Sequence, residues 1–113
     1  MSTIFKKIIN KEINSNIIYE DDICIAFDDV NPIAPTHILI IPKKEIATIN
    51  DIEEKDKELV GHLFIVAKKI AKKLSIDKDG YRLIFNCNDN GGQTVYHIHM
   101  HLIGGRKFSW PPG

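Results

Sequence analysis

Three histidines stand at alternate positions near the end of the chain, at His97, His99 and His101, and an apolar residue follows each of them. Successive side chains of a β-strand point to opposite faces, so in a strand these three imidazoles share one face. Alternate positions on a strand lie about 7 Å apart, and three imidazoles at that spacing are a poor way to fill a core. The pattern therefore predicts a functional site.

Two kinds of chemistry fit such a row of histidines. Alternate histidines on a strand can share a zinc or copper ion, although that site needs a further histidine, cysteine or carboxylate and groups that orient its ligands. A neutral imidazole can instead attack a phosphoryl group while a neighbour orients it or handles the leaving-group proton. The residues around the row have to decide between the two.

The segment directly before the row, residues 86–94, is polar and rich in glycine, with the sequence NCNDNGGQT. Its glycines permit unusual backbone angles, and its amides and side chains can surround the oxygens of a phosphate. Such a loop is weak evidence by itself, because it also suits a plain turn. Next to three histidines it favours chemistry at phosphorus.

Composition narrows the class of ligand. The 15 basic and 15 acidic residues balance, so the sequence favours a small ligand over nucleic acid or a membrane surface. The first 20 residues hold no apolar signal core, and no apolar run approaches the roughly 20 residues that span a bilayer, so we expect a cytoplasmic protein. Cys24 and Cys87 are far apart and belong to no Cys-x-x-Cys pair, which predicts buried free thiols rather than a disulfide or a zinc knuckle.

The elements that must position the histidines follow from the spacing of apolar residues. A short helix is predicted after Ser2, which serves as its N-cap, and a long helix over about residues 52–74, with His62 given no catalytic part. Strands are predicted at residues 17–19, 23–27, 37–41, 81–85 and 95–103. The fold class expected is α+β, as a single domain over residues 1–113.

The segment His97 to Ile103 resembles the His-φ-His-φ-His-φ-φ signature of the histidine triad superfamily, where φ is apolar. Residues 34–37, 41–44, 91–96, 104–106 and 110–113 extend the likeness to the Hint branch, so that it covers nearly the whole chain. Histidine rather than glutamine at position 101 argues against the nucleotidyltransferase branch. The resemblance implies a five-stranded antiparallel sheet with two helices, continued across a homodimer whose C-terminal tails approach the partner's site.

The resemblance also implies a function, the cleavage of the P–N bond of purine nucleoside 5′-phosphoramidates through a nucleotidyl-histidine intermediate. His99 resembles the nucleophile and His101 the residue that contacts the phosphate and the scissile group. His97 resembles the residue that orients His99, with support from His37. The loop on the phosphate side matches Asn86, Gly92, Gln93 and Thr94, where the Thr94 hydroxyl lies near the leaving group, and Val95 joins it as a nucleotide-binding position.

The resemblance further implies a nucleoside pocket. Asp29 occupies the position whose carboxylate accepts both ribose hydroxyls, and Asp28 lies beside it. The apolar slot for the base matches Ile4, Phe5, Ile8, Phe27 and Val30; read without the family, Phe27 and Ile8 are simply core residues and Asp29 a loop carboxylate. The expected ligands are AMP or GMP and their phosphoramidate or acyl-adenylate conjugates.

Cofactors and alternative functions complete these expectations. Thr3 and Lys6 stand where many bacterial relatives carry a Cys-x-x-Cys for a structural zinc, so we expect no such zinc and no other cofactor. An imidazole with its ordinary pKa of about 6.5 is largely unprotonated at neutral pH, so attack by His99 needs no metal. A nucleotide-binding regulatory protein without relevant turnover and a histidine-based metal protein stay open as alternatives.

Overall fold

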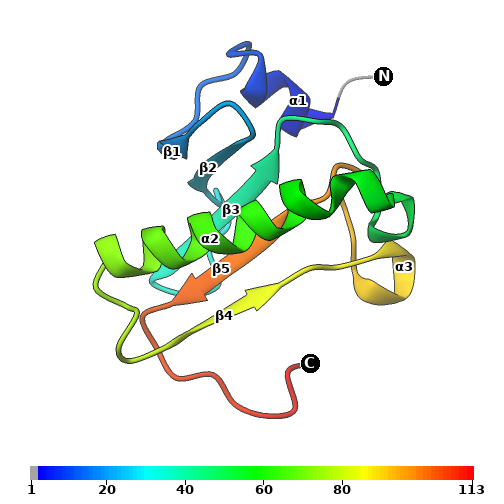
Figure 1. Cartoon of the computed structure of the whole chain (residues 1–113). Helices are drawn as coiled ribbons and strands as arrows, with labels where there is room; N and C mark the ends of the chain where they lie inside the picture. Colours follow the sequence, from blue (N-terminus) through cyan, green and yellow to red (C-terminus); the bar gives the residue numbers. More distant parts are fainter. Residues whose placement is uncertain (1–2) are drawn as a thin grey trace.

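The computed structural model describes residues 3–113 as a five-stranded antiparallel sheet with helices on both faces (Figure 1). The strands lie in the order β1-β2-β3-β5-β4. The elements are α1 (Ile4–Ile9), β1 (Ile17–Glu20), β2 (Cys24–Asp28), β3 (Thr36–Pro42), the 3-10 turns η1 (Ile49–Asp51) and η2 (Glu54–Asp56), α2 (Lys57–Lys73), β4 (Tyr81–Ile84), α3 (Asn88–Gly91) and β5 (Met100–Gly104). The predicted fold class is confirmed, with the short α3 as an addition.

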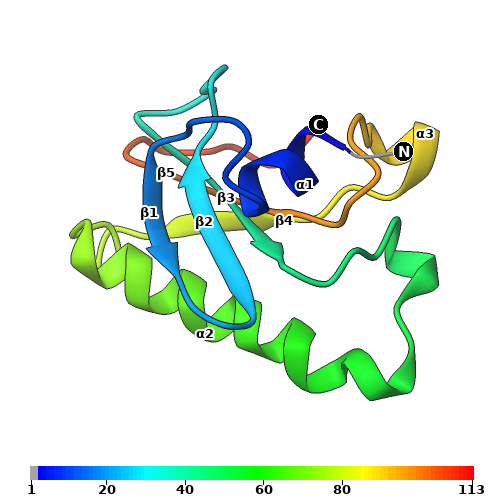
Figure 2. The ribbon, with the colours of Figure 1, turned by 90° about the horizontal axis from the view of Figure 1, so that it is seen from above.

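The two faces of the sheet carry separate apolar clusters because side chains alternate along the strands. On one face, Ile38 and Ile40 of β3 pack with Leu63, Val66 and Ile70 of α2. On the other face, Leu39 and Ile41 of β3 and Phe27 of β2 pack with Phe5 and Ile8 of α1. Figure 2 shows α1 and α2 on opposite sides of the strands. The central strands are therefore covered on both faces, and the α1 face is the one that receives the histidines.

Both helices begin later than the sequence pattern predicts. The N-cap of α1 is Thr3, whose hydroxyl accepts the Lys6 amide at 3.1 Å; Ser2, the predicted cap, lies outside the described residues. The long helix begins at Lys57 and not near residue 52. Thr48 and Asp51 bond each other in a capping box, and a second 3-10 turn follows it, so the chain makes two tight turns before α2 starts.

The last strand also differs from its prediction, because it begins at Met100 and not at Val95. Between these residues the backbone leaves the ladder: the Ile98 amide donates to the Ile46 carbonyl at 2.8 Å. The segment thus bonds to the loop that follows β3 rather than to a neighbouring strand. His97 and His99 consequently lie on a bent approach to β5, and of the triplet only His101 belongs to the strand.

Two further observations concern the whole described chain. Cys24 is fully buried as expected, whereas Cys87 is only half-buried; both are free thiols. Among residues 3–113, no helix has the length and apolar character that crossing a bilayer requires.

Candidate active site

The three imidazoles of the triplet lie on the α1 face of the sheet. The Phe5 ring of α1 packs edge-on against His99, with ring centroids 4.9 Å apart, and lies 6.2 Å from the His97 ring. The rings of His99 and His101 are 5.0 Å apart. Met100, between these two, points to the opposite face and joins the core beneath α2. The alternation that predicts one shared face thus continues through the bent approach to β5.

His99 is held by the backbone of the residue two positions before it. Its Nδ1 lies 2.8 Å from the His97 carbonyl oxygen, which can only accept, so Nδ1 carries the hydrogen. The neutral ring then has its lone pair on Nε2. Burial lowers the pKa of His99 below its ordinary value, against the opposing effects of this hydrogen bond and of Asp29. At neutral pH the ring is therefore an unprotonated base and a potential nucleophile.

His97 is a buried anchor, and its side chain does not line the cavity. Its Nε2 donates to the Pro42 carbonyl at 2.7 Å, at the end of β3. Its Nδ1 is buried and finds no partner among the described residues. Burial lowers the pKa of His97, so this ring too is neutral. The contact between His97 and His99 is made by the His97 carbonyl and not by the His97 imidazole.

His101 is held by His37, which corrects the expectation that His37 supports His97. The Nε2 of His37 lies 2.9 Å from the Nδ1 of His101. The contact follows from strand pairing, because Leu39 stands directly opposite His101 and His37 is two residues before Leu39 on the same face. Burial, followed by the neighbouring His99 and His37, lowers the pKa of His101 to about 4.

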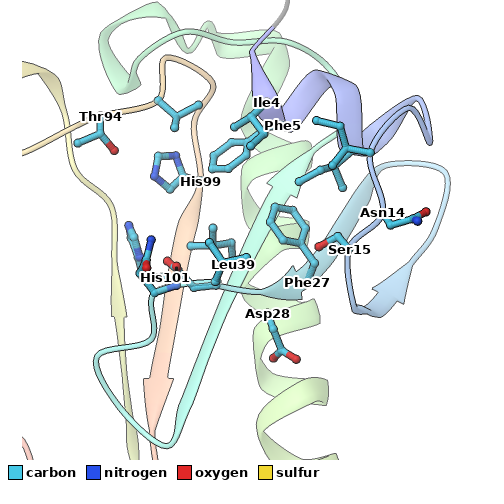
Figure 3. Close-up of a pocket in the computed structure, with 16 residues that line it drawn as sticks. Ile4, Phe5, Asn14, Ser15, Phe27, Asp28, Leu39, Thr94, His99 and His101 are labelled. Carbon is cyan, nitrogen blue, oxygen red and sulfur yellow. Dashed lines mark hydrogen bonds between the residues drawn. The ribbon is translucent and has the colours of Figure 1, made fainter.

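A cavity of about 370 Å³ opens beside His99 and His101 (Figure 3), a size that suits a small organic ligand. Apolar side chains from α1, β2 and β3 form most of its wall, and the two histidines lie together at one end of it. Eleven predicted nucleotide-site residues line it: Ile4, Phe5, Ile8, Phe27, Asp28, Asp29, Val30, Thr94, Val95, His99 and His101. The structure thus gathers most of the predicted site around one cavity.

The two aspartates at the end of β2 have different partners. One carboxylate oxygen of Asp29 accepts the Asn31 amide at 2.8 Å, and the other lies 3.3 Å from the Nε2 of His37. Asp28 instead accepts the side-chain amide of Asn16 at 2.5 Å. Asp29 is therefore the carboxylate that is connected to the histidine cluster, and Asp28 braces the loop before β1.

The predicted phosphate loop divides into a supporting part and a part that reaches the cavity. The Gln93 side chain accepts the Asn88 amide at 2.9 Å and donates to the carbonyls of Ala47 and Val95. Gly92 takes a left-handed conformation, with φ of 81°, at the end of α3. Neither residue lines the cavity, and neither does Asn86. Gln93 fixes the loop so that Thr94 and Val95 reach the cavity wall.

Five cavity residues were missed by the sequence analysis: Ile13, Asn14, Ser15, Asn31 and Leu39. The alternation along β3 offers a signal for Leu39, because it places this residue on the same face as His37. Asn31 directly follows the predicted aspartate region. The stretch from Ile13 to Ser15 belongs to an irregular connection between α1 and β1, and nothing in its composition indicates a binding site.

Among residues 3–113, two groups of side chains come close enough to share a metal ion, and neither fits one well. In the group of Asp29, His37 and His101, the Nδ1 of His37 accepts a backbone amide, so its Nε2 carries a hydrogen and offers no lone pair. In the group of Asp21, Cys24 and His62, burial raises the pKa of Cys24 to about 12, which disfavours the thiolate that metals need. The geometry favours hydrogen bonding over metal binding at both places.

Comparisons with known proteins agree with this geometry. The family model of the HIT domain matches residues 10–108. The purine nucleoside phosphoramidase of Escherichia coli is 57% identical over 104 residues, which cover 92% of this chain and 87% of the relative. An uncharacterized HIT-like protein of Synechocystis is 52% identical over 111 residues, or 98% and 96% of the two chains. A HIT family hydrolase from Legionella pneumophila superposes with a TM-score of 0.97 at 53% identity, covering 99% of this chain and 100% of the other.

Proposed function

Because this chain belongs to the HIT domain family, we propose that it is a nucleotide hydrolase that cleaves the P–N bond of purine nucleoside 5′-phosphoramidates. One observation carries the proposal: His99, held with its lone pair on Nε2, lines a nucleoside-sized cavity beside His101. The likeness to the purine nucleoside phosphoramidase of E. coli supports the choice of substrate.

The cavity has the chemical groups that a purine nucleotide requires. The base lies in the slot formed by Ile4, Phe5 and Ile8 of α1 and Phe27 of β2, where flat apolar surface is buried. Asp29 at the rim accepts the ribose hydroxyls. These contacts hold the phosphorus atom near His99, so that attack becomes an effectively unimolecular step.

The reaction proceeds in two balanced steps. The lone pair on Nε2 of His99 forms a bond to phosphorus as the P–N bond breaks, and the nitrogen, protonated from solvent beforehand, departs as the amine with the electron pair of that bond. The product is a nucleotidyl-histidine. Water then attacks phosphorus, the bond from phosphorus to Nε2 breaks with its electron pair returning to the imidazole, and the proton lost by water goes to solvent as the nucleoside monophosphate is released. His101 donates a hydrogen bond to the phosphoryl group, and Thr94 lies near the departing amine.

The test is the release of AMP from adenosine 5′-phosphoramidate, with EDTA present throughout. Wild type should turn over, and His99→Ala should lose turnover while still binding AMP, because the variant removes the nucleophile and spares the slot. Asp22→Asn is the control, since Asp22 lies in an exposed turn outside the cavity, and it should retain activity. If wild type binds AMP and releases none from the substrate, the chain is a nucleotide-binding protein and the proposal fails.

A further inference from the structure

His37 contacts the site from behind, bonding to His101 without lining the cavity itself. We propose that His37 is a positioning residue that fixes His101 as the tautomer with hydrogen on Nε2, so that His101 is a permanent hydrogen-bond donor and neither a general acid nor a general base. The role of His101 toward substrate rests on the proposed function. The tautomer itself does not depend on it.

A backbone amide determines the tautomer of His37. The Ile33 N–H lies 3.2 Å from the Nδ1 of His37, and an amide N–H can only donate. Nδ1 of His37 is therefore an acceptor, and the neutral ring carries its hydrogen on Nε2. Arg106, just after β5, donates to the Ile33 carbonyl from its Nε and Nη2 atoms, at 3.3 and 3.1 Å, and so holds in place the residue whose amide contacts His37.

The tautomer of His37 determines which nitrogen of His101 carries hydrogen. The Nε2–H of His37 faces two acceptors, the Nδ1 of His101 at 2.9 Å and a carboxylate oxygen of Asp29 at 3.3 Å. Nδ1 of His101 is then unprotonated, and its hydrogen must lie on Nε2. That Nε2 is buried and has no partner among the described residues, although His101 lines the cavity. A buried donor without a partner is costly, and a substrate oxygen is the natural acceptor for it.

Burial and a neighbouring imidazole favour the neutral state of His101, and a carboxylate opposes it. His99 faces the pair from the approach to β5, and Asp29, whose charge raises the pKa of His101, faces it from the loop after β2. Burial together with the imidazoles of His99 and His37 lowers the pKa of His101 to about 4. Adding a second proton to His101 requires breaking the hydrogen bond that its Nδ1 now accepts.

A consequence follows for the source of the leaving-group proton. A neutral His101 with one N–H can give that proton away only by becoming an imidazolate, which is far too basic to form at neutral pH. The amine leaving group therefore takes its proton from the substrate, whose bridging nitrogen is protonated before the bond breaks. His101 contributes by stabilising the charge on the phosphoryl oxygens, a donor placed where charge develops.

The direct test is a two-bond ¹H–¹⁵N correlation spectrum of protein with ¹⁵N-labelled histidine, which distinguishes protonated from unprotonated ring nitrogens. In the wild type we expect hydrogen on Nε2 of His101 and on Nδ1 of His99. His37→Phe keeps a flat ring and removes the donor, so His101 should populate both tautomers. Asp22→Asn, in the exposed turn of the β1–β2 hairpin, is the control and should leave the His101 signals unchanged. This measurement needs no substrate, so it tests the tautomers independently of the proposed function. If the expected tautomers are found but the protein shows no turnover, the proposed function fails and the tautomer proposal stands.

Kinetics add a second readout. His37→Phe should lower kcat by about tenfold with little change in KM, since it disturbs a donor that acts in the transition state, and His37→Asn should restore part of the loss because its amide can donate. If His37→Phe does not fold, Ile33→Pro removes the controlling amide hydrogen at a residue whose side chain is 58% exposed. Hydrogen on Nδ1 of His101 in the wild type overturns the proposal, and so does an unchanged tautomer with unchanged kcat in the folded variant.

Discussion

Backbone groups determine which nitrogen carries hydrogen in three histidines of the candidate site, His37, His97 and His99. The carbonyl of His97 accepts a hydrogen bond from Nδ1 of His99, and the carbonyl of Pro42 accepts one from Nε2 of His97. The amide of Ile33 donates a hydrogen bond to Nδ1 of His37. A backbone group cannot exchange its role as donor or acceptor, whereas a side chain such as histidine can. The site is thus pre-arranged before any ligand arrives, which is the condition for electrostatic stabilisation of a transition state.

The pH dependence of turnover follows from the state of His99. Burial lowers its pKa, so the protonated and inactive form accumulates only at a pH below the ordinary value of about 6.5. We expect no loss in kcat/KM of the wild type as the pH falls from about 8 to 6.5, and a decline only at more acidic pH. Steady-state rates over that range measure it. A decline centred at or above the ordinary histidine pKa contradicts an unprotonated nucleophile held by burial.

We propose that Asp29 both accepts the ribose hydroxyls and contacts His37, and a pair of substrates can separate the two roles. Asp29→Asn should raise KM for the ribonucleotide substrate by about tenfold, because the amide is a poorer acceptor for two hydroxyls. On a 2′,3′-dideoxy substrate the ribose part of the effect disappears, and any remaining loss reports the contact with His37, 3.3 Å away. An unchanged KM for the ribonucleotide removes the ribose role. Asp22→Asn, in an exposed turn, is the control.

The sequence predicts which residues form this site better than it predicts their hydrogen-bond partners. Alternation alone places the histidines on one face, and the family pattern finds most of the cavity wall. The partner of His37 could not be predicted, because it depends on the register between β3 and β5, which are more than 50 residues apart in sequence. The role of Gln93 was missed for a similar reason, since its side-chain amide bonds to Ala47 across the fold.

At the level of elements, the predicted strands and helices are nearly all present, and the errors lie at their ends. Periodicity identifies the buried face of α2 but cannot show that Thr48 and Asp51 close a separate turn before it. The last strand was extended too far because residues 95–99 alternate like a strand while their hydrogen bonds go to the loop after β3. This departure brings the backbone of His97 into position to hold His99.

A clamp between the β1–β2 hairpin and α2 is a further element that the sequence did not reveal. Asp21, in the turn of the hairpin, accepts the amides of Ile23 and Cys24, both at 2.8 Å. Its other oxygen lies 2.6 Å from the Nε2 of His62 on α2 and 2.8 Å from the Tyr19 hydroxyl. His62, expected to be an ordinary helix residue, is therefore the contact through which α2 holds the hairpin.

Removing the charge of this clamp should destabilise the fold. Burial opposes ionisation of Asp21, but its four hydrogen bonds keep the pKa of the carboxyl far below its ordinary range. A carboxyl whose pKa is lower in the folded protein stabilises the fold at pH values above its ordinary pKa, and this stabilisation is lost as the pH falls below that value. The clamp is therefore fully formed at neutral pH. We expect Asp21→Asn to lower the free energy of unfolding by about 2 kcal/mol at pH 7 and by less in acid.

Urea unfolding of the wild type, Asp21→Asn and the matched variant Asp22→Asn, at neutral and acidic pH, measures this effect. Asp22 is exposed and lies next to Asp21 in the same turn, so its variant controls for the loss of one negative charge. Equal stability of the two variants at neutral pH would show that the hydrogen bonds of Asp21 contribute nothing beyond its charge.

At the scale of the molecule, the histidine cluster and α2 lie on opposite faces of one sheet, and the edge strand β4 is left with a free side among the described residues. Beyond β5 the chain runs back along β4, where Arg82 donates to the Ser109 carbonyl at 3.0 Å and stacks over the Phe108 ring. Trp110, just beyond, is 82% exposed. A free strand edge beside exposed aromatic surface is a place where a second copy can add.

The family likeness implies a homodimer, and the edge at β4 is where we expect it to form. Phe64 of α2 is 46% exposed and packs beside Phe85, which follows β4, so an apolar patch continues the strand edge. Sedimentation should give twice the chain mass of 12.9 kDa for the wild type. Phe64→Glu, which buries a charge in that contact, should give the monomer mass, whereas Ile49→Glu at the exposed η1 turn should not. A monomeric wild type, or a Phe64→Glu variant that stays dimeric, shows that the β4 edge is not the interface.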